Sequence, residues 1–378
     1  MRILHATDTF GPTLGGIEVM VHQLASAQAH AGHDVTVLTR TPGPDTPPAP
    51  GVAGVCRRPE QLDRLLRGAD VVHGHVSAWS PLALRAVGSA AREDVPAVAT
   101  VHSMWGAAWP AFRAGAVLGG WTGRRVQWAA VSDAAARPVR RALRERDVLV
   151  VPNAVDTAFW APRGPSDPRS EVTVVAVGRM HRRKRPLRLV SVLEQARALV
   201  PDATSIRAVV VGDGPQHAAF CREVAARGMQ SWVQAPGDLS HHQIRGLYDE
   251  ADVFVAPATL ESFGIAALEA RTAGLVVLAR EHTGVGTFVD HGVDGLLSRS
   301  DAEMAEQLAH LCTDADVRGR MSVHNRTTVP ALDWANVLHR NEHAYAAAGA
   351  VEHACLCVPV ASGDRGGQGP DPASRAWS

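Results

Sequence analysis

Short apolar runs alternate with longer amphipathic segments along most of this chain. A run of about four to eight apolar residues between turn residues is typical of a strand that is buried on both faces. Strands that alternate with helices pair in parallel, and the helices then cover both faces of the sheet. The pattern therefore predicts an α/β fold with doubly wound parallel sheets. In the first half of the chain, the expected strands are residues 2–6, 34–39, 70–75, 97–102, 127–131 and 148–151.

A second series of the same kind follows and indicates a second domain. A chain of 378 residues is longer than one hydrophobic core usually supports, so two domains of about 150 residues each are expected. Residues 161–170 are rich in proline, glycine and polar residues, which is the composition of a linker. The second set of expected strands is 171–177, 206–211, 232–235, 252–256, 275–279 and 295–298.

The linker divides the chain into an N-terminal domain at residues 1–160 and a C-terminal domain at residues 171–330. Residues 331–348 have the apolar spacing of one more helix. The remainder, residues 349–378, ends in a stretch rich in glycine, proline, serine and charge, and is expected to form a disordered tail.

The composition is that of a soluble globular protein. With a net charge of +0, the chain has no general attraction to nucleic acid. Its first residues form a strand-like run rather than a signal peptide, and no apolar run approaches the roughly 20 residues needed to span a bilayer. We therefore expect a cytoplasmic protein. The five cysteines show no zinc-ligand spacing and suit free thiols: Cys56, Cys221, Cys312, Cys355 and Cys357.

Lysine is almost absent from this chain. Among the 38 basic residues, Lys184 is the single lysine, which favours a site-specific role for it. Several arginines fall on the predicted helix 133–144 and just beyond it, where a solvated surface is the simplest interpretation. The alternative is a dock for an anionic acceptor or for the inner face of a membrane. These residues are Arg137, Arg140, Arg141, Arg144 and Arg146.

One strand-helix-strand unit in the second domain offers a site for an anion. Ser262 is the predicted N-cap of its helix, which would begin at Phe263 with unpaired N–H groups. Gly264 would let another molecule approach this backbone, where the positive end of the helix dipole favours a phosphate. Two carboxylates flank the helix start and could accept hydroxyl groups, although an isolated pair also describes solvated surface residues. They are Glu261 and Glu269.

Two further turns carry phosphate-binding chemistry. Gly15 and Gly16 lie between the first strand and its helix, where bare N–H groups can face a ligand. Arg179 and Lys184 follow the strand 171–177, and Pro186 suits the first turn of the next helix. The arginine fork and the lysine charge could bind one phosphate group together, although a basic cluster alone also describes a solvated loop or a membrane-facing patch.

Polar residues recur just past the expected strands of the first domain. The ligand crevice of an open parallel sheet lies outside the carboxyl ends of its strands, so these residues are candidates for one wall of a cleft. The chain contains neither a dinucleotide fingerprint nor a P-loop, which disfavours a nicotinamide oxidoreductase and a P-loop NTPase. Any one of these polar residues is more often a helix cap than a ligand contact. They are Asp8, His75, His102, Ser132 and Asn153.

Taken in order, these motifs resemble the GT-B-fold family 4 retaining glycosyltransferases over residues 1–348. The resemblance implies two Rossmann-like domains that face each other across a central cleft. The C-terminal domain would hold a nucleotide-diphosphate sugar, the N-terminal domain would hold the acceptor, and the helix at 331–348 would cross back to the N-terminal domain. The motifs lie at residues 15–16, 101–103, 130–132, 151–156, 178–184, 211–215 and 261–269.

The resemblance also implies roles for individual residues. The diphosphate would be bound by Arg179 and Lys184, the ribose by Glu269, and the donor sugar by Glu261 and by His102 from the opposite wall. The catalytic set is then His102, Arg179, Lys184 and Glu261. The donor-binding set is Gly15, Gly16, Arg179, Lys184, Gly237, Glu261, Phe263, Gly264, Ile265 and Glu269.

Family members commonly need no bound metal, and the nucleotide-diphosphate sugar is a co-substrate rather than a cofactor. They keep the anomeric configuration without an enzymic nucleophile, and cations stabilise the charge that builds on the leaving phosphate. The resemblance implies a UDP- or GDP-sugar donor and a small-molecule, saccharide or lipid-linked acceptor. Two alternatives stay open: a nucleotide-sugar epimerase or hydrolase of the same fold, and a non-catalytic protein that binds sugar nucleotides.

Three segments depart from the family pattern. Ala154 stands where glycine is usual, so the interdomain turn there is expected to differ. Thr287 stands where many members place a carboxylate. The loop with Trp105 and Trp109 fits no pattern, and its tryptophans suit stacking on a sugar ring or a lipid as well as plain packing.

Overall fold

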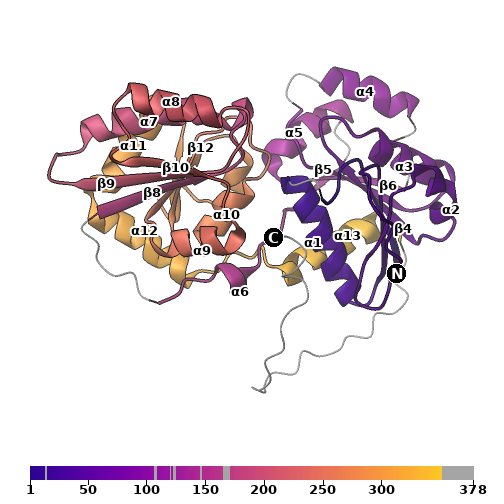
Figure 1. Cartoon of the computed structure of the whole chain (residues 1–378). Coiled ribbons are helices and arrows are strands. Elements are labelled where there is room, and N and C mark those ends of the chain that lie inside the picture. The colour runs from indigo at the N-terminus through magenta and orange to yellow at the C-terminus, as the bar shows by residue number, and fades with distance from the viewer. Residues whose placement is uncertain are drawn as a thin grey trace, which may run out of the picture.

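The structure is a computed structural model that describes residues 1–12, 15–105, 109–119, 121, 125–144, 147–164 and 171–350. These residues form two α/β lobes, each built around one sheet of parallel strands (Figure 1). Both sheets place helices on their two faces, so their central strands are buried on both sides. The predicted α/β fold is confirmed.

The N-terminal lobe has a seven-stranded sheet in the order β3-β2-β1-β4-β5-β6-β7. The central strand β4 is buried at every residue, as expected of a strand covered on both faces, although it carries His73 and His75. The strands are β1 (Arg2–Thr7), β2 (Asp34–Thr39), β3 (Gly54–Cys56), β4 (Val71–Val76), β5 (Ala97–Val101), β6 (Val126–Ala130) and β7 (Val148–Val150).

Side chains at the carboxyl edge of this sheet cap the helices around it. The carboxylate of Asp8 accepts hydrogen bonds from the backbone N–H groups of Leu82 and Ala83 at 3.0 and 3.2 Å, and so caps α3. Asp8 is thus a helix cap rather than a ligand contact. The helices are α1 (Gly16–His30), η1 (Pro59–Gln61), α2 (Leu62–Leu66), α3 (Pro81–Arg92), α4 (Trp109–Leu118) and α5 (Asp133–Ala142). The short helix α6 (Thr157–Trp160) follows and packs on the C-terminal lobe, where Trp160 contacts Tyr248.

The C-terminal lobe has a six-stranded sheet in the order β10-β9-β8-β11-β12-β13, in which the chain reverses direction across the sheet between β8 and β11. Such a switch point opens a crevice at the carboxyl ends of the two strands. The strands are β8 (Glu171–Val177), β9 (Ser205–Val211), β10 (Val233–Gly237), β11 (Val253–Ala256), β12 (Val276–Arg280) and β13 (Gly295–Ser298).

The helices of the C-terminal lobe begin at clear sequence signals. Pro186 occupies the first turn of α7, as expected, and Ser240 and Gln243 form a capping box at α9. The helical elements are η3 (Arg182–Lys184), α7 (Pro186–Leu199), α8 (His217–Ala226), α9 (His241–Asp249), α10 (Ile265–Thr272), η4 (Gly284–Thr287), α11 (Asp301–Thr313) and α12 (Ala315–Thr327).

The last helix, α13 (Trp334–Ala347), leaves the C-terminal lobe and packs beside α1 on the N-terminal lobe (Figure 1). Ala344, Tyr345 and Ala348 are buried in one hydrophobic cluster with residues of β1 and α1. The Tyr345 hydroxyl accepts a hydrogen bond from Gln28 Nε2 at 2.8 Å. The helix therefore fastens the end of the second domain to the core of the first.

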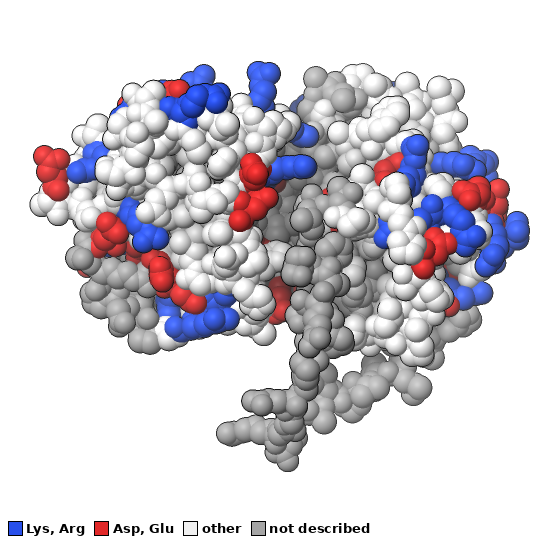
Figure 2. All heavy atoms as spheres, viewed as in Figure 1, with Lys and Arg blue, Asp and Glu red and all other residues white. Residues whose placement is uncertain are grey.

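Several expectations from the sequence fall partly outside the described residues. The linker prediction rests largely on residues 165–170 and the tail prediction on residues 351–378, so the domain limits stay predictions. The described cysteines, Cys56, Cys221 and Cys312, are free thiols. No helix in the described part of the chain is long and apolar enough to cross a bilayer. Figure 2 shows acidic and basic residues intermingled on the face in view.

Candidate functional site

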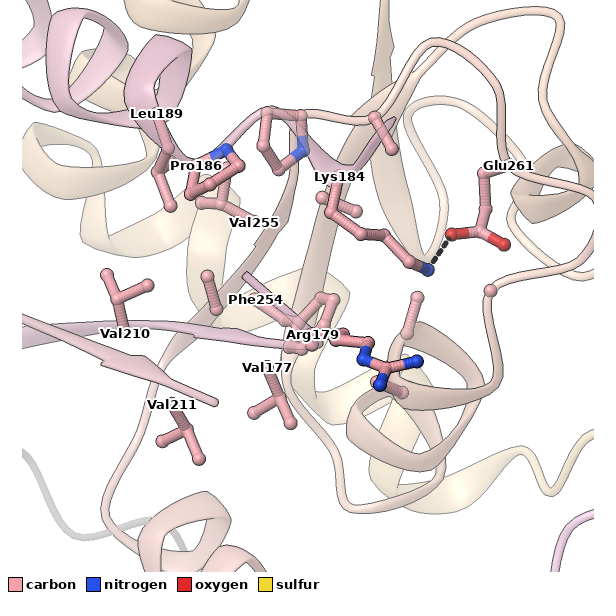
Figure 3. A pocket seen from close by; sticks show the side chains of 18 of the residues that line it. Val177, Arg179, Lys184, Pro186, Leu189, Val210, Val211, Phe254, Val255 and Glu261 are labelled. Carbon is pink, nitrogen blue, oxygen red and sulfur yellow. Dashed lines mark hydrogen bonds and ion pairs between the residues drawn. The ribbon is translucent and has the colours of Figure 1, made fainter. Parts of the chain in front are cut away.

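A pocket opens at the carboxyl edge of the C-terminal sheet, where β8 and β11 end and α10 begins. Arg179, Lys184, Glu261, Gly264 and Ile265 line it, so half of the predicted donor-binding residues gather in one place. Figure 3 shows the side chains of Arg179 and Lys184 extending toward the side of the pocket where Glu261 lies. The pocket therefore has two cations and one carboxylate at its rim.

Lys184 forms an ion pair with Glu261. The lysine side chain is 45% exposed, whereas that of Glu261 is 14% exposed, so the pair lies at the mouth of the pocket. The sequence placed these residues at one site but gave no sign of their direct contact. The pair neutralises both charges in the free protein, and an anion that bound Lys184 would leave the carboxylate of Glu261 free to accept a hydroxyl group.

Arg179 is exposed, and its guanidinium makes no hydrogen bond or ion pair with any residue that the structure describes. The turn that carries it is nevertheless fixed, because Met180 N–H donates to Asp213 O at 2.8 Å. A held backbone with an unpaired guanidinium is suited to bidentate binding of a phosphate group.

Helix α10 begins at Ile265, so the predicted start at Phe263 with Ser262 as N-cap is wrong. Gly264 is the N-cap, with φ 94° and ψ 58°, and no side chain caps the helix. A Cβ on Gly264 would also lie only 2.8 Å from Val285 Cγ2, so both the backbone conformation and the space require glycine. The first N–H groups of the helix consequently face the pocket without a side-chain acceptor.

Ser262 instead joins the two lobes. Its carbonyl accepts a hydrogen bond from Ser132 Oγ at 2.6 Å, and the same hydroxyl caps α5. From the other side, Gly284 N–H donates to Glu261 O at 2.8 Å, and a side chain at Gly284 would collide with the Ser262 carbonyl. The turn η4 supports this loop sterically, and Thr287 at its end supplies no carboxylate.

Glu269 lies further along α10 and is half-buried. Desolvation raises the pKa of its carboxyl from 4.5 to about 8. The carboxyl makes no hydrogen bond to a residue that the structure describes, while the neighbouring Tyr248 hydroxyl donates to Ala266 O at 3.2 Å. A partly buried carboxyl without a partner suits a ligand that brings its own hydroxyl groups.

The N-terminal lobe brings its glycine turn to the opposite side. A Cβ on Gly16 would lie 3.6 Å from Ile265 Cδ1, so the starts of α1 and α10 approach each other across the lobes. The Glu18 carboxylate folds back over Gly15, so a side chain there would have to displace it. Sequence reasoning missed Glu18, although an acidic residue in a first turn signals this interaction with the helix dipole.

Two other predicted donor-binding residues lie beside the pocket rather than in its lining. Phe263 is buried, and its ring packs against Phe288 with centroids 5.3 Å apart, so its side chain is part of the core. Gly237 ends β10, where its carbonyl accepts a hydrogen bond from Gly212 N–H at 2.8 Å. Only their backbone groups would be available to a ligand.

His102 follows β5 and is half-buried, so it lies at the carboxyl edge of the N-terminal sheet as predicted. Its Nε2 lies 3.0 Å from His75 Nδ1. Burial lowers the pKa of His102 from 6.5 to about 4, so the imidazole is neutral at pH 7. His75, another predicted cleft residue, is buried beneath it and cannot reach the cleft itself.

The buried histidines predict acid sensitivity. The pKa values of His5 and His102 fall to about 4, and those of His73 and His75 fall well below 6.5, chiefly through desolvation. Between about pH 4 and 6.5, the unfolded chain therefore binds more protons than the folded one. The free energy of unfolding falls as the pH is lowered through that window. As the pH falls, each of the four histidines lowers the free energy of unfolding by about 1.4 kcal/mol per pH unit. Glu269, whose pKa is raised in the folded chain, has the opposite effect and offsets about one histidine.

Urea unfolding at pH 7.5, 6.5, 5.5 and 4.5 measures this effect. The midpoint should rise slightly from pH 7.5 to 6.5, because Glu269 takes up a proton in the folded chain alone, and should fall steeply below pH 6.5. Equal midpoints at pH 6.5 and 4.5 would contradict the buried, neutral state of the cluster.

Other predicted surfaces have simpler roles where they are described. Trp105 is buried and packs on Phe112 with ring centroids 3.7 Å apart, which favours packing over ligand stacking; residues 106–108 of that loop lie outside the described part. In the basic cluster, Arg140 contacts Asp133 at 3.2 Å, whereas Arg137 and Arg141 are exposed. Contact of this helix with a membrane stays a prediction.

Comparison with known families covers both lobes. The family model described as Glycosyltransferase Family 4 matches residues 14–159, and the one described as Glycosyl transferases group 1 matches residues 163–328. The chain belongs to the family 4 glycosyltransferases. The first match contains the glycine turn and His102, and the second contains all residues that line the pocket.

This glycosyltransferase has relatives in distant organisms. It is 26% identical to a subunit of the phosphatidylinositol N-acetylglucosaminyltransferase of Arabidopsis thaliana, over 91% of this chain and 81% of that protein. It is 27% identical to the glycogen synthase of Mycobacterium tuberculosis, over 92% and 95% of the two chains. The solved structure of Anabaena Alr3699/HepE in complex with UDP superposes with a TM-score of 0.73 at 17% identity, covering 92% of this chain and all of that one. The fold is therefore GT-B, as the sequence resemblance implied.

Proposed function

We propose that this family 4 glycosyltransferase moves a hexosyl group from a UDP- or GDP-sugar to a small-molecule, saccharide or lipid-linked acceptor, with retention of anomeric configuration. One observation carries the proposal. Arg179, Lys184 and the open start of α10 surround a single pocket, with the carboxyl of Glu261 at its rim and that of Glu269 one turn further along α10, outside the lining. Such a pocket fits a diphosphate that carries a hydroxyl-rich group at each end.

The bound diphosphate would replace Glu261 as the partner of the Lys184 ammonium. Arg179 and the first N–H groups of α10 then stabilise the charge that develops on the leaving β-phosphate. The bond between the anomeric carbon and the phosphate oxygen breaks, and the acceptor oxygen bonds to that carbon on the same face. The acceptor proton passes to the leaving phosphate, so no side chain need act as nucleophile or base.

The freed carboxylate of Glu261 and the imidazole of His102 would hold the donor sugar from opposite walls. Glu269 would accept the ribose hydroxyl groups. Two side-chain cations and the helix dipole take the place that a divalent metal has in other nucleotide-sugar enzymes, so we propose that transfer needs no metal.

The donor base is supported by similarity alone. The Anabaena protein with this fold has been solved with UDP and with UDP-glucose, at TM-scores of 0.73 and 0.70. Among relatives, the D-inositol 3-phosphate glycosyltransferase of Xylanimonas cellulosilytica is 28% identical over 85% of this chain. These likenesses favour UDP over GDP and leave the acceptor class open.

The rival functions differ from transfer in what they consume. An epimerase or hydrolase of this fold would turn over donor without an acceptor, and a non-catalytic binding protein would bind donor without turnover. Neither Arg179 nor the carboxyl of Glu269 has a hydrogen-bond partner among the residues that the structure describes. Such groups do not stabilise the free protein, which favours an active site over a decayed one.

The test is a donor and acceptor matrix. UDP- and GDP-sugars are incubated with the purified chain, with and without inositol phosphates, oligosaccharides and lipid-linked sugars, in the presence of EDTA. We expect release of nucleoside diphosphate only when both donor and acceptor are present. NMR of the product should show a glycosidic bond with the same anomeric configuration as the donor sugar. Acceptor-independent release would support the epimerase or hydrolase, and loss of activity in EDTA would contradict metal independence.

A further inference from the structure

A continuous chain of hydrogen bonds runs from His102 into the core of the N-terminal lobe. His102 Nε2 lies 3.0 Å from His75 Nδ1, and His75 Nε2 lies 2.9 Å from His5 Nδ1. His5 Nε2 in turn lies 2.6 Å from Gln28 Oε1. Strand register builds the cluster, because His5 pairs with His73 across β1 and β4 and His75 follows on the same face. His5 and His75 are buried, and Gln28 lies on α1, which covers that face.

The acceptor at the inner end sets the direction of this chain. The carbonyl oxygen Gln28 Oε1 can only accept, so His5 carries its proton on Nε2 and its Nδ1 is an acceptor. His75 must then donate from Nε2 and accept at Nδ1, and His102 must donate from Nε2. The Nδ1 atom of His102 is left as a bare acceptor, and it has no partner among the residues that the structure describes.

Tyr345 on α13 contacts the other end of the Gln28 amide. Gln28 Nε2 donates to the Tyr345 hydroxyl at 2.8 Å, and that hydroxyl lies 2.9 Å from His73 Nδ1. Having accepted from the amide, the hydroxyl donates to His73, whose Nε2 then donates to Thr100 Oγ1 at 2.8 Å. If the amide were reversed, every donor and acceptor in the chain would reverse with it. The orientation of the Gln28 amide thus sets the polarity of the chain, and the helix that returns from the C-terminal lobe holds that amide through the Tyr345 hydroxyl.

A metal centre is the competing interpretation, because nitrogen atoms of His5, His73 and His75 lie within 4.8 Å of one another. The ring geometry opposes it. His73 and His75 stack with centroids 4.3 Å apart at 26°, and His5 and His75 stack at 5.1 Å and 20°. Imidazole lone pairs lie in the ring plane, so stacked rings do not converge on one ion. Both ring nitrogens of each residue also have a hydrogen-bond partner already.

We propose that His75, His5 and Gln28 form a positioning relay that holds His102 as the neutral Nε2-protonated imidazole, with Nδ1 presented as an acceptor for a substrate hydroxyl, and that Tyr345 on α13 holds the amide that sets its direction. The proposal rests on the role proposed above for His102 at the donor sugar. It makes His102 a group that selects a hydroxyl donor on the substrate and rejects an acceptor at the same position. The relay residues themselves do not touch the substrate.

The first test needs no substrate. Histidine in the full-length chain is labelled with ¹⁵N, and long-range ¹H–¹⁵N spectra at pH 7.5 report which ring nitrogen carries the proton. The His102 signal is assigned by its loss in a His102→Asn variant. Nε2 protonation of His102 is the expected result. Nδ1 protonation, a charged ring, or a stoichiometric metal ion bound to the purified protein would overturn the proposal.

The second test uses a matched pair of variants at one position. His75→Leu removes both ring nitrogens, whereas the amide of His75→Asn keeps an acceptor near the position of Nδ1, facing His102. Loss of one hydrogen bond corresponds to roughly a fivefold change, so His75→Leu should lower kcat/KM about five- to tenfold. His75→Asn should retain activity within about threefold. A purely structural role predicts the opposite order, since asparagine leaves the larger cavity.

Tyr345→Phe gives a milder variant that removes one hydroxyl and keeps the ring. The His102 spectrum should change to a mixture of the two neutral tautomers, while His30→Gln, at the exposed end of α1, should leave it unchanged. An unaltered His102 tautomer in Tyr345→Phe would overturn the role of α13. If the wild-type chain transferred no sugar, the proposed function would fail, and the relay would then be judged by the spectra alone.

Discussion

Replacing Lys184 by alanine is expected to lower kcat at least about a hundredfold, which corresponds to roughly 2.7 kcal/mol at the barrier. Lys184 is the ammonium at the pocket mouth and the single lysine among 38 basic residues. A cation aimed at the leaving phosphate acts on charge that develops in the transition state, so its loss reduces kcat rather than only raising KM.

The ion pair sharpens this prediction. In Lys184→Ala the carboxylate of Glu261 loses its partner beside the phosphate site, and the resulting repulsion adds to the loss of the cation. Arg183→Ala is the matched control, because Arg183 is exposed on the same short helix and does not line the pocket. Initial rates at saturating donor compare the two variants. A folded Lys184→Ala enzyme within a few fold of wild type would remove Lys184 from the site.

Replacing Glu269 by alanine should have an effect of similar size, again at least about a hundredfold in kcat/KM. One acidic residue would then cease to accept the hydroxyl groups of the donor ribose, and charge-assisted hydrogen bonds of this kind are worth about 1.5–3 kcal/mol each. Folding should not suffer, because the buried carboxyl has no partner in the described part of the chain. Glu306→Ala, an exposed position on α11, is the control.

The pKa of Glu269, about 8, gives this prediction a pH dependence. The free enzyme holds the carboxyl protonated at pH 7, whereas only the ionised form can accept from two hydroxyl groups. Donor binding therefore releases a proton, and the KM for donor should fall as pH rises from 7 through 8. A KM that rises over this range, or that keeps its pH dependence in Glu269→Gln, would contradict the assignment.

Much of the fold could be predicted because parallel strands need long apolar runs, which leave a clear pattern. Most of the expected strands lie within two residues of those in the structure. β3 was missed because Gly54–Cys56 is a three-residue edge strand, too short for a periodic signal. Helices α11 and α12 were not predicted, and the second of them is polar along much of its length.

The sequence indicated several of the residues that line the candidate site, but not the contacts between them. The start of α10 was placed two residues early because Ser262 is a good local N-cap, whereas contacts of Gly284 and Val285, some 20 residues later in the chain, fix Gly264 there instead. The Lys184–Glu261 pair and the His5–His75–His102 chain join residues that are far apart in sequence. Such contacts depend on strand register and loop packing, which a single sequence does not reveal.

The central claim is that the pocket of Arg179, Lys184 and α10 binds a nucleoside diphosphate. A thermal-shift titration of the wild-type chain and of Lys184→Ala with UDP, GDP, ADP and TDP, with and without magnesium, tests it most directly. A ligand at 100 times its Kd stabilises the fold by about 2.7 kcal/mol. We predict that one diphosphate, UDP before GDP, raises the melting temperature of the wild type without metal, and that Lys184→Ala loses most of the shift. No shift with any diphosphate, or an equal shift in the variant, would contradict the account.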